Sequence, residues 1–250
     1  MRSSLSRIWV LTTRNVKEIL RDPLSLAFTL GLPLIMEILF YLIFHELTDQ
    51  FQMKYLAPGI VVFSQAFLSL FVGLLISVDR NTSFLTRLYV SKAKSYEFIF
   101  AYAISVLPIV AIQSVLFFLV AIIFDSSIFS LGMLFSILIS IFTSLFFIAA
   151  GIFFGSLCNE KSIGGIASIC IVGQSVLSGM WFPIDGLNEG MIAFMNALPF
   201  RNATQLVQNL LIGVNNTFDD FLKPFLIVLA YTIVLFVIAI FTFRSKMKAK

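Results

Sequence analysis

The sequence predicts an all-α polytopic membrane protein with six transmembrane helices, and three observations support this fold class. The chain of 250 residues is 59% hydrophobic and only 12% charged, whereas a soluble domain averages about 25% charged residues. Its mean hydropathy is +1.00. Apolar segments of about 20 residues, long enough to cross roughly 30 Å of hydrocarbon as helices, recur along the chain and are separated by short polar connections.

The N-terminal segment, residues 1–23, is expected to form an amphipathic helix on the cytoplasmic surface of the membrane. Its apolar side chains and its cations fall on opposite sides of a helix: Leu5, Ile8, Trp9, Thr12, Val16, Ile19 and Leu20 on one side, and Arg7, Arg14, Lys17 and Arg21 on the other. The apolar stripe can reach the acyl boundary while the basic side meets anionic headgroups. We therefore expect membrane lipid to be a partner of this helix.

Six spans follow within a single permease domain that occupies residues 1–250. The spans are expected at residues 24–44, 56–78, 98–124, 128–157, 163–181 and 225–243. With both termini in the cytoplasm, 14 of the 17 Lys and Arg residues lie inside, which agrees with the positive-inside rule. The other three are Lys54, Arg201 and Lys223.

The cytoplasmic loop of residues 79–97 is the longest polar interruption between the early spans. Asn81, Thr82 and Ser83 are residue types that favour helix N-caps, and apolar side chains then recur at helical spacing. The pattern predicts a short surface helix. Two interpretations stay open from these residues alone: a solvated helix against the headgroups, or one that docks into a cytoplasmic partner.

An external segment, residues 182–224, is apolar but too interrupted to form a clean span. The interruptions are Pro183, Gly186, Gly190 and Pro199. Two short helices, at residues 192–198 and 204–212, are expected to dip into the outer leaflet or lie on it. Asn202 or Thr204 is expected to cap the second helix.

Three polar side chains inside the predicted spans are candidates for a translocation path: Glu37, Gln65 and Gln174. An unpaired charge at the bilayer centre costs roughly 2.5 to 3.5 kcal/mol, so Glu37 is expected to face protein or water, or to be neutral. Hydrogen bonding between helices is the alternative for Gln65 and Gln174, and also for Gln113, at about 0.6 kcal/mol each.

Motifs for catalysis or metal binding are missing from the sequence, and no catalytic residue, metal site or cofactor is expected in this chain. His45 is the single histidine, and HELTD departs from the H-E-x-x-H pattern of zinc proteases. Cys158 and Cys170 are expected to be buried free thiols. No basic tract with interleaved aromatic residues predicts a nucleic-acid partner. The sequence also lacks G-x-x-x-x-G-K-[ST], so any ATP hydrolysis must occur on another polypeptide.

The order of these elements resembles the membrane permeases of type-2 ABC transporters, a class that includes drug, polysaccharide and lipid exporters. The resemblance covers nearly the whole chain. It rests on the N-terminal amphipathic helix, the six spans, FLTRLYVSKAKS after the second span, and SGMWFPIDGLNEGMIAFMNALPFRNATQLVQNLL after the fifth.

The resemblance implies roles for both loops. The loop after the second span would be a coupling helix whose contacts with the ATPase come from Phe84, Leu85, Arg87, Leu88 and Tyr89. The external helices would form a re-entrant gate over the exit, with Trp181, Pro183 and Pro199 at its bends. One copy carries half of the usual twelve spans, so the resemblance implies a homodimer or a pair with a related permease.

The expected function is export of a hydrophobic or amphiphilic substrate, such as a drug, lipid, glycan or peptide, across a bacterial cell membrane. Two soluble ABC ATPase subunits would bind ATP and Mg²⁺ and supply the energy. Two alternatives from other classes remain at this point: an intramembrane enzyme, and a membrane immunity or assembly protein that transports nothing.

Overall fold

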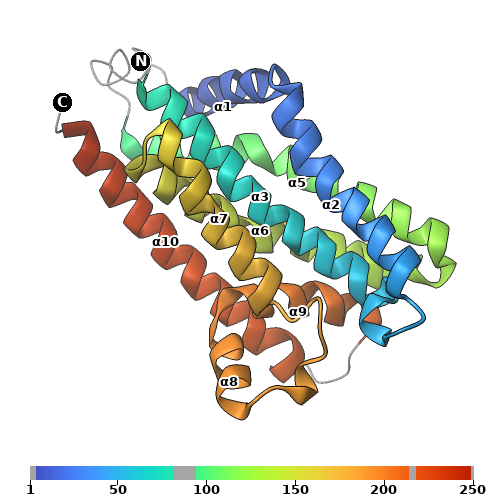
Figure 1. The fold of residues 1–250 in the computed structure, drawn as a ribbon. Helices are drawn as coiled ribbons and strands as arrows, with labels where there is room; N and C mark the ends of the chain where they lie inside the picture. The colour runs from blue at the N-terminus through green and yellow to red at the C-terminus, as the bar shows by residue number, and fades with distance from the viewer. Residues whose placement is uncertain (1–3, 82–93, 214–217, 249–250) are drawn as a thin grey trace.

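The computed structural model describes residues 4–81, 94–213 and 218–248, and in these ranges it contains helices and short connections but no strand. The all-α prediction is therefore confirmed for the described residues. The long helices run side by side, α1 crosses one end of the bundle, and α8 and α9 lie at the other (Figure 1). The helices are α1 Ser4–Leu20, α2 Pro23–Phe44, α3 Met53–Asn81, α5 Ser95–Phe124, α6 Leu131–Leu157, α7 Glu160–Leu177, α8 Glu189–Ala197, α9 Pro199–Ile212 and α10 Lys223–Lys248.

Five helical segments of the described chain are long and apolar enough to cross a membrane. They are α2, α3, α5, α6 and the helical stretch Phe218–Ser245, which contains most of α10. The segment expected as the fifth span is not among them. Its helix, α7, has only 18 residues. Three of them, Glu160, Lys161 and Gln174, are strongly polar and lower the mean hydropathy of the helix.

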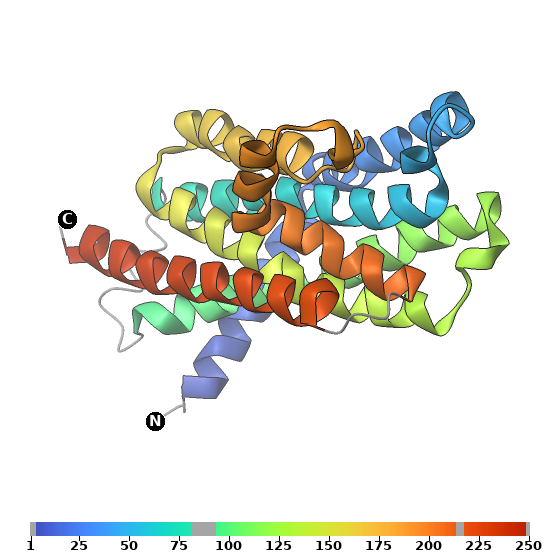
Figure 2. The ribbon, with the colours of Figure 1, turned by 90° about the horizontal axis from the view of Figure 1, so that it is seen from below.

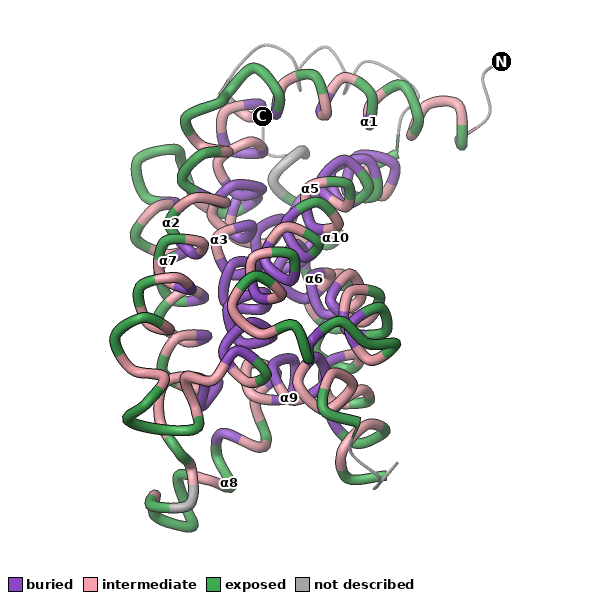
Figure 3. Tube along the Cα trace, turned by 90° about the vertical axis from the view of Figure 1, so that its right-hand side faces the viewer, coloured by how far each residue is buried: buried purple, intermediate pink, exposed green. Residues whose placement is uncertain are grey.

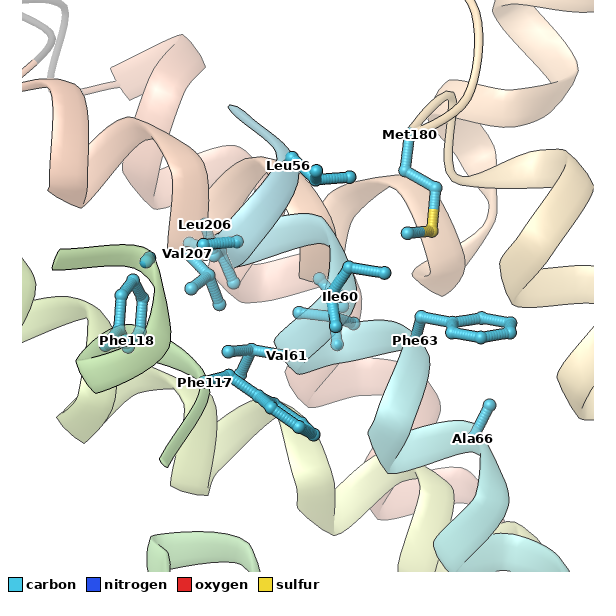
Figure 4. Packing of buried hydrophobic residues seen from close by; sticks show 14 of the residues in the cluster. Leu56, Ile60, Val61, Phe63, Ala66, Phe117, Phe118, Met180, Leu206 and Val207 are labelled. Atoms are coloured by element: carbon cyan, nitrogen blue, oxygen red, sulfur yellow. The ribbon is translucent and has the colours of Figure 1, made fainter. Parts of the chain in front are cut away.

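Helix α3 forms the centre of the bundle. In its most apolar 18-residue window 78% of residues are buried, against 17% in α2, so α2 lies at the periphery. The burial map shows the same contrast between inner and outer turns (Figure 3). Leu56, Ile60 and Val61 of α3 belong to one buried apolar cluster with Phe117 of α5 and Val207 of α9, so the cluster joins three helices (Figure 4).

A close approach of α3 and α6 depends on glycine. A Cβ atom at Gly151 would lie 2.6 Å from the carbonyl oxygen of Ser69, and one at Gly155 would lie 2.7 Å from that of Gly73. Gly151 and Gly155 form a G-x-x-x-G pattern on α6 that faces small residues of α3. This spacing lets two membrane helices bring their backbones into contact.

The bundle end that carries α1 also holds the end of α10. The start of α1 and the end of α10 lie at that same end in two perpendicular views (Figures 1 and 2). Asp22 follows α1 and caps α2 by accepting a hydrogen bond from the Ser25 amide at 3.1 Å, with Pro23 as the first helical residue. This cap stops α1 and redirects the chain into the bundle.

The prediction that Asn202 or Thr204 caps the second external helix is wrong. That helix, α9, begins at Pro199, so both residues lie inside it. Proline suits the first turn because its missing N–H would have no partner there. Asn202 instead donates to the carbonyl oxygens of Asn196 (2.8 Å) and Leu198 (2.6 Å), and so satisfies the end of α8.

Candidate functional site at the base of the central loop

An ion pair joins α1 to the end of α3. Arg14 Nη2 lies 2.6 Å from Asp79 Oδ1, and Arg14 Nη1 binds the other carboxylate oxygen. The Tyr102 hydroxyl of α5 also donates to Asp79 Oδ2. Asp79 is 1% exposed, so its negative charge is held by these donors rather than by water. Three helices are thereby fastened at one carboxylate.

A second ion pair joins α1 to the start of α5. Arg7 donates to both oxygens of Glu97, from Nε at 2.9 Å and from Nη2 at 2.7 Å. Glu97 also accepts a hydrogen bond from the Lys94 amide at 3.0 Å, as part of the α5 N-cap. Hydrogen bonding to Glu97 raises the pKa of the Arg7 guanidinium. We call Arg7, Arg14, Asp79, Glu97 and Tyr102 the arginine clasp.

The arginine clasp changes the interpretation of α1. Arg7 and Arg14 were expected to meet lipid headgroups, but they turn toward the bundle because buried carboxylates bind them more specifically than mobile lipids can. Lys17 and Arg21 remain exposed. The buried residues of α1 are Thr12, Asn15 and Ile19.

The clasp acts on the two stems of the central loop. Asp79 lies near the end of α3 and Glu97 near the start of α5. Arg80, next to Asp79, donates to the carbonyl oxygens of Gly155 (3.0 Å) and Cys158 (3.1 Å), which fixes the end of α6 to the same stem. A displacement of the loop would therefore reach four helices. The residues assigned to coupling lie outside the described residues: Phe84, Leu85, Arg87, Leu88 and Tyr89.

Gln65 belongs to a hydrogen-bonded network in the middle of the bundle. Its Nε2 donates to the carbonyl oxygen of Ser140 at 2.8 Å, and its Oε1 accepts from Thr143 at 2.9 Å. The Ser140 hydroxyl lies 2.8 Å from that of Ser114. These bonds connect α3, α6 and α5. In this structure Gln65 therefore forms hydrogen bonds between helices, which was the alternative to a place in the translocation path.

Gln113 compensates for a proline inside α2. Pro33 has no N–H, so the carbonyl oxygen of Thr29 one turn earlier lacks its helical partner. Gln113 Nε2 of α5 donates to that oxygen at 3.3 Å. The proline therefore ties α2 to α5 at a position where α2 is otherwise lightly packed.

Glu37 lies one turn beyond Pro33 on the same buried face of α2. It is fully buried, and neither carboxylate oxygen has a hydrogen-bond partner among the described residues. Gln174 of α7 instead donates to the Thr204 hydroxyl of α9 at 2.8 Å. No hydrogen bond in the described part of the chain joins Glu37, Gln65 and Gln174 to one another, so the structure does not gather them into one polar cluster.

The three residues assigned to the external gate have separate surroundings. Trp181 Nε1 donates to the Ser175 hydroxyl at 2.8 Å, and its ring centroid lies 4.6 Å from that of Phe40 on α2. Pro183 is exposed before a short 3-10 turn. Pro199 is buried at the start of α9. Trp181 thus connects the end of α7 to α2, and Pro199 starts a helix that packs across α6, α3 and α10.

The comparison with protein families identifies the chain. A model described as "ABC-2 type transporter" matches residues 6–212, which run from α1 to the last residue of α9. The chain belongs to the ABC-2 type transporter family. A comparison with curated proteins gives no match. As an ABC-2 permease the protein is a multi-pass membrane subunit of an ABC transporter, and membership implies ATPase partners.

The ion pairs of Asp79 and Glu97 in this ABC-2 permease were not expected from the sequence. A signal was present, because the two acids flank the central loop while Arg7 and Arg14 stand two helical turns apart on one face of α1. The sequence instead favoured lipid headgroups as the partners of these cations. Among the described residues no group of three or more His, Cys, Asp or Glu side chains could hold a metal ion.

Proposed function

We propose that this ABC-2 permease exports a hydrophobic or amphiphilic substrate from the cytoplasm of a bacterial cell, driven by two separate ABC ATPase subunits that bind ATP and Mg²⁺. The observation that carries the proposal is the arginine clasp. It links both stems of the central loop to α1, and the residues between those stems are the ones that resemble a coupling helix. A cytosolic ATPase that pushes the loop would move α1, α3 and α5 together.

In the proposed orientation the bundle end with α1 lies in the cytoplasm. The cation distribution of the sequence supports this side. Helix α7 completes six spans, because 18 residues rise about 27 Å, close to the roughly 30 Å of the hydrocarbon core. Its Glu160 and Lys161 begin the helix and would lie at the cytoplasmic surface.

The proposed assembly pairs two permeases along α7. Gly164 and Gly165 on this helix have open space where a Cβ would lie, and Ile169, Val172 and Val176 are exposed. A small-residue surface with apolar neighbours suits close packing against another membrane helix. The partner would be a second copy of this chain or a related permease. The substrate path would follow this interface. Its polar candidates are Glu37, Gln65 and Gln174, and a movement of the helices would have to uncover them because all three are buried.

The outer end of this path would be closed by α8 and α9 as a re-entrant gate. Trp181 supports this role because it contacts α2, which shares with the α10 segment the lowest buried fraction of the membrane-length helices. Movement of α2 would therefore reach the start of the segment that holds Pro183 and Pro199. The bends at Pro183 and Pro199 would let α8 and α9 shift without unwinding a transmembrane helix.

The proposal is tested with the permease and a candidate ABC ATPase partner, purified together and reconstituted in proteoliposomes. We expect ATP-dependent movement of a fluorescent amphiphile. Replacing Leu85 and Leu88 with Asp should abolish co-purification of the ATPase and transport. The matched control is Leu47→Asp, an exposed leucine at the other end of the bundle, which should keep both. Retained association of the double variant would contradict the coupling role.

A further inference from the structure

A groove runs between α2 and α3 from the bundle end that carries α1. Its first part, a hollow of about 280 Å³, is lined by Glu18, Arg21 and Asp22 together with apolar residues of α3. Its second part, of about 240 Å³, is lined by residues such as Phe28 and Phe67. The two hollows share the side chains of Ser25, Phe71 and Leu74, so they form one continuous feature. We call it the α2–α3 groove.

Two cations near the charged end of the groove have no ion-pair partner among the described residues. Glu18 is paired with Arg14 at 2.6 Å, and Asp22 accepts the Ser25 amide as a helix cap. Arg21 and Lys17 are exposed and have no ion-pair partner among the described residues. Both line an adjoining hollow of about 530 Å³ on α1. An anion at this end would therefore meet two cations that form no ion pair with the described residues, beside two carboxylates that are engaged by Arg14 and by the Ser25 amide.

The other end of the groove is apolar and opens outward. Leu24 and Phe28, which flank it, are 68% and 61% exposed. Phe28 also lines a further hollow that continues along α2 past Gly31 to Met36. From Ser25 to Met36 the helix rises about 17 Å. Such a length of apolar surface suits an extended hydrocarbon chain better than a compact ligand.

We propose that the α2–α3 groove binds an anionic, phosphate-bearing amphiphile from the leaflet at the α1 end of the bundle. The phosphate lies between Lys17 and Arg21, where charge-assisted hydrogen bonds are available, and the acyl chain lies between α2 and α3. The combination of two exposed cations beside the mouth and an apolar floor favours this class over a purely apolar protein helix, which would offer no anion to those cations. The binding requires α2 and α3 to span the membrane but no ATPase, so its failure is distinguishable from failure of the proposed function.

The test uses the full chain in lipid nanodiscs that contain a photoactivatable phosphatidic acid or a phosphatidylcholine with identical chains. We expect phosphatidic acid to label peptides from residues 24–36 and 67–75 preferentially. Replacing Lys17 and Arg21 with Gln should lower this labelling about tenfold, the equivalent of one charge-assisted hydrogen bond. The control is Arg244→Gln, an exposed cation at the end of α10, which should leave labelling unchanged.

A second variant tests the apolar part. Leu74→Trp fills the shared section of the groove and should abolish labelling, whereas Ile233→Trp on the exposed face of α10 should not. Equal labelling by the two lipids, or labelling unaffected by the Lys17 and Arg21 changes, would overturn the proposal. The cation variants alter only exposed side chains, so this outcome does not depend on how well the tryptophan variant folds.

Discussion

Arg14 of α1 and Asp79 of α3 lie 65 residues apart in the chain and bind each other through two parallel hydrogen bonds. Asp79 is almost fully buried while Arg14 keeps 28% of its side chain exposed. The carboxylate therefore depends on the arginine more than the arginine depends on the carboxylate. This asymmetry predicts which partner is costly to remove.

Arg14→Gln should destabilise the permease by about 2 kcal/mol, because it leaves the buried Asp79 carboxylate without its charged donor. Thermal or denaturant unfolding in detergent measures the change. In Asp79→Asn the same Arg14 substitution should cost less than half as much, since no buried charge remains. Lys17→Gln, which removes an exposed cation of the same helix, is the control and should shift stability by less than about 0.5 kcal/mol. Equal costs for Arg14 and Lys17 would refute the clasp.

Gly155→Val should prevent α3 and α6 from packing as they do, because its Cβ would meet backbone atoms of Gly73 that cannot rotate away. We expect a loss of about 3 kcal/mol or failure to fold, at the upper end of overpacking costs. Gly31→Val in α2 is the matched control, since nothing lies within 4 Å of its Cβ position and it lies outside the proposed α7 interface. Yield of monodisperse protein and its unfolding temperature separate the two variants. Similar behaviour of both would show that the close contact is absent.

A double-mutant cycle tests the link between Pro33 and Gln113. Gln113→Leu should cost about 1 kcal/mol in the natural sequence, because the freed carbonyl oxygen of Thr29 then has no donor. In a Pro33→Ala background the new amide at position 33 can donate to that oxygen, so the Gln113 substitution should cost measurably less. Additive costs in the unfolding measurement would mean that the two residues act independently.

The sequence predicted the helical class well because apolar length is a strong local signal. α2, for example, begins at Pro23, one residue before the expected span, since Asp22 and Pro23 provide a cap and a first residue that act locally. The predicted start of the second external helix was wrong for the opposite reason. Asn202 is a residue type that favours N-caps, but its amide binds carbonyl oxygens at the end of α8, and no local pattern reveals that contact.

The contacts of the candidate site were harder to predict than its location. The central loop was recognisable from its polarity, yet the pairing of Arg14 with Asp79 and of Arg7 with Glu97 depends on how α1 lies across the bundle. Gln113 likewise could be expected to bond between helices, but its acceptor exists only because Pro33 frees an oxygen on another helix. Such partners depend on the packing of helices that are far apart in the sequence. The charge distribution and the periodicity of the sequence do not determine that packing.

The central claim is that the bundle end with α1 and the central loop faces the cytosolic energy source. The most direct test replaces Cys158 and Cys170 with Ser and introduces one cysteine at Thr13 on α1 or at Leu47 after α2, both exposed. Intact cells are then treated with a membrane-impermeant maleimide. The account predicts labelling at position 47 and none at position 13 until the cells are opened; labelling at 13 with protection at 47 would place the arginine clasp outside the cell and contradict it.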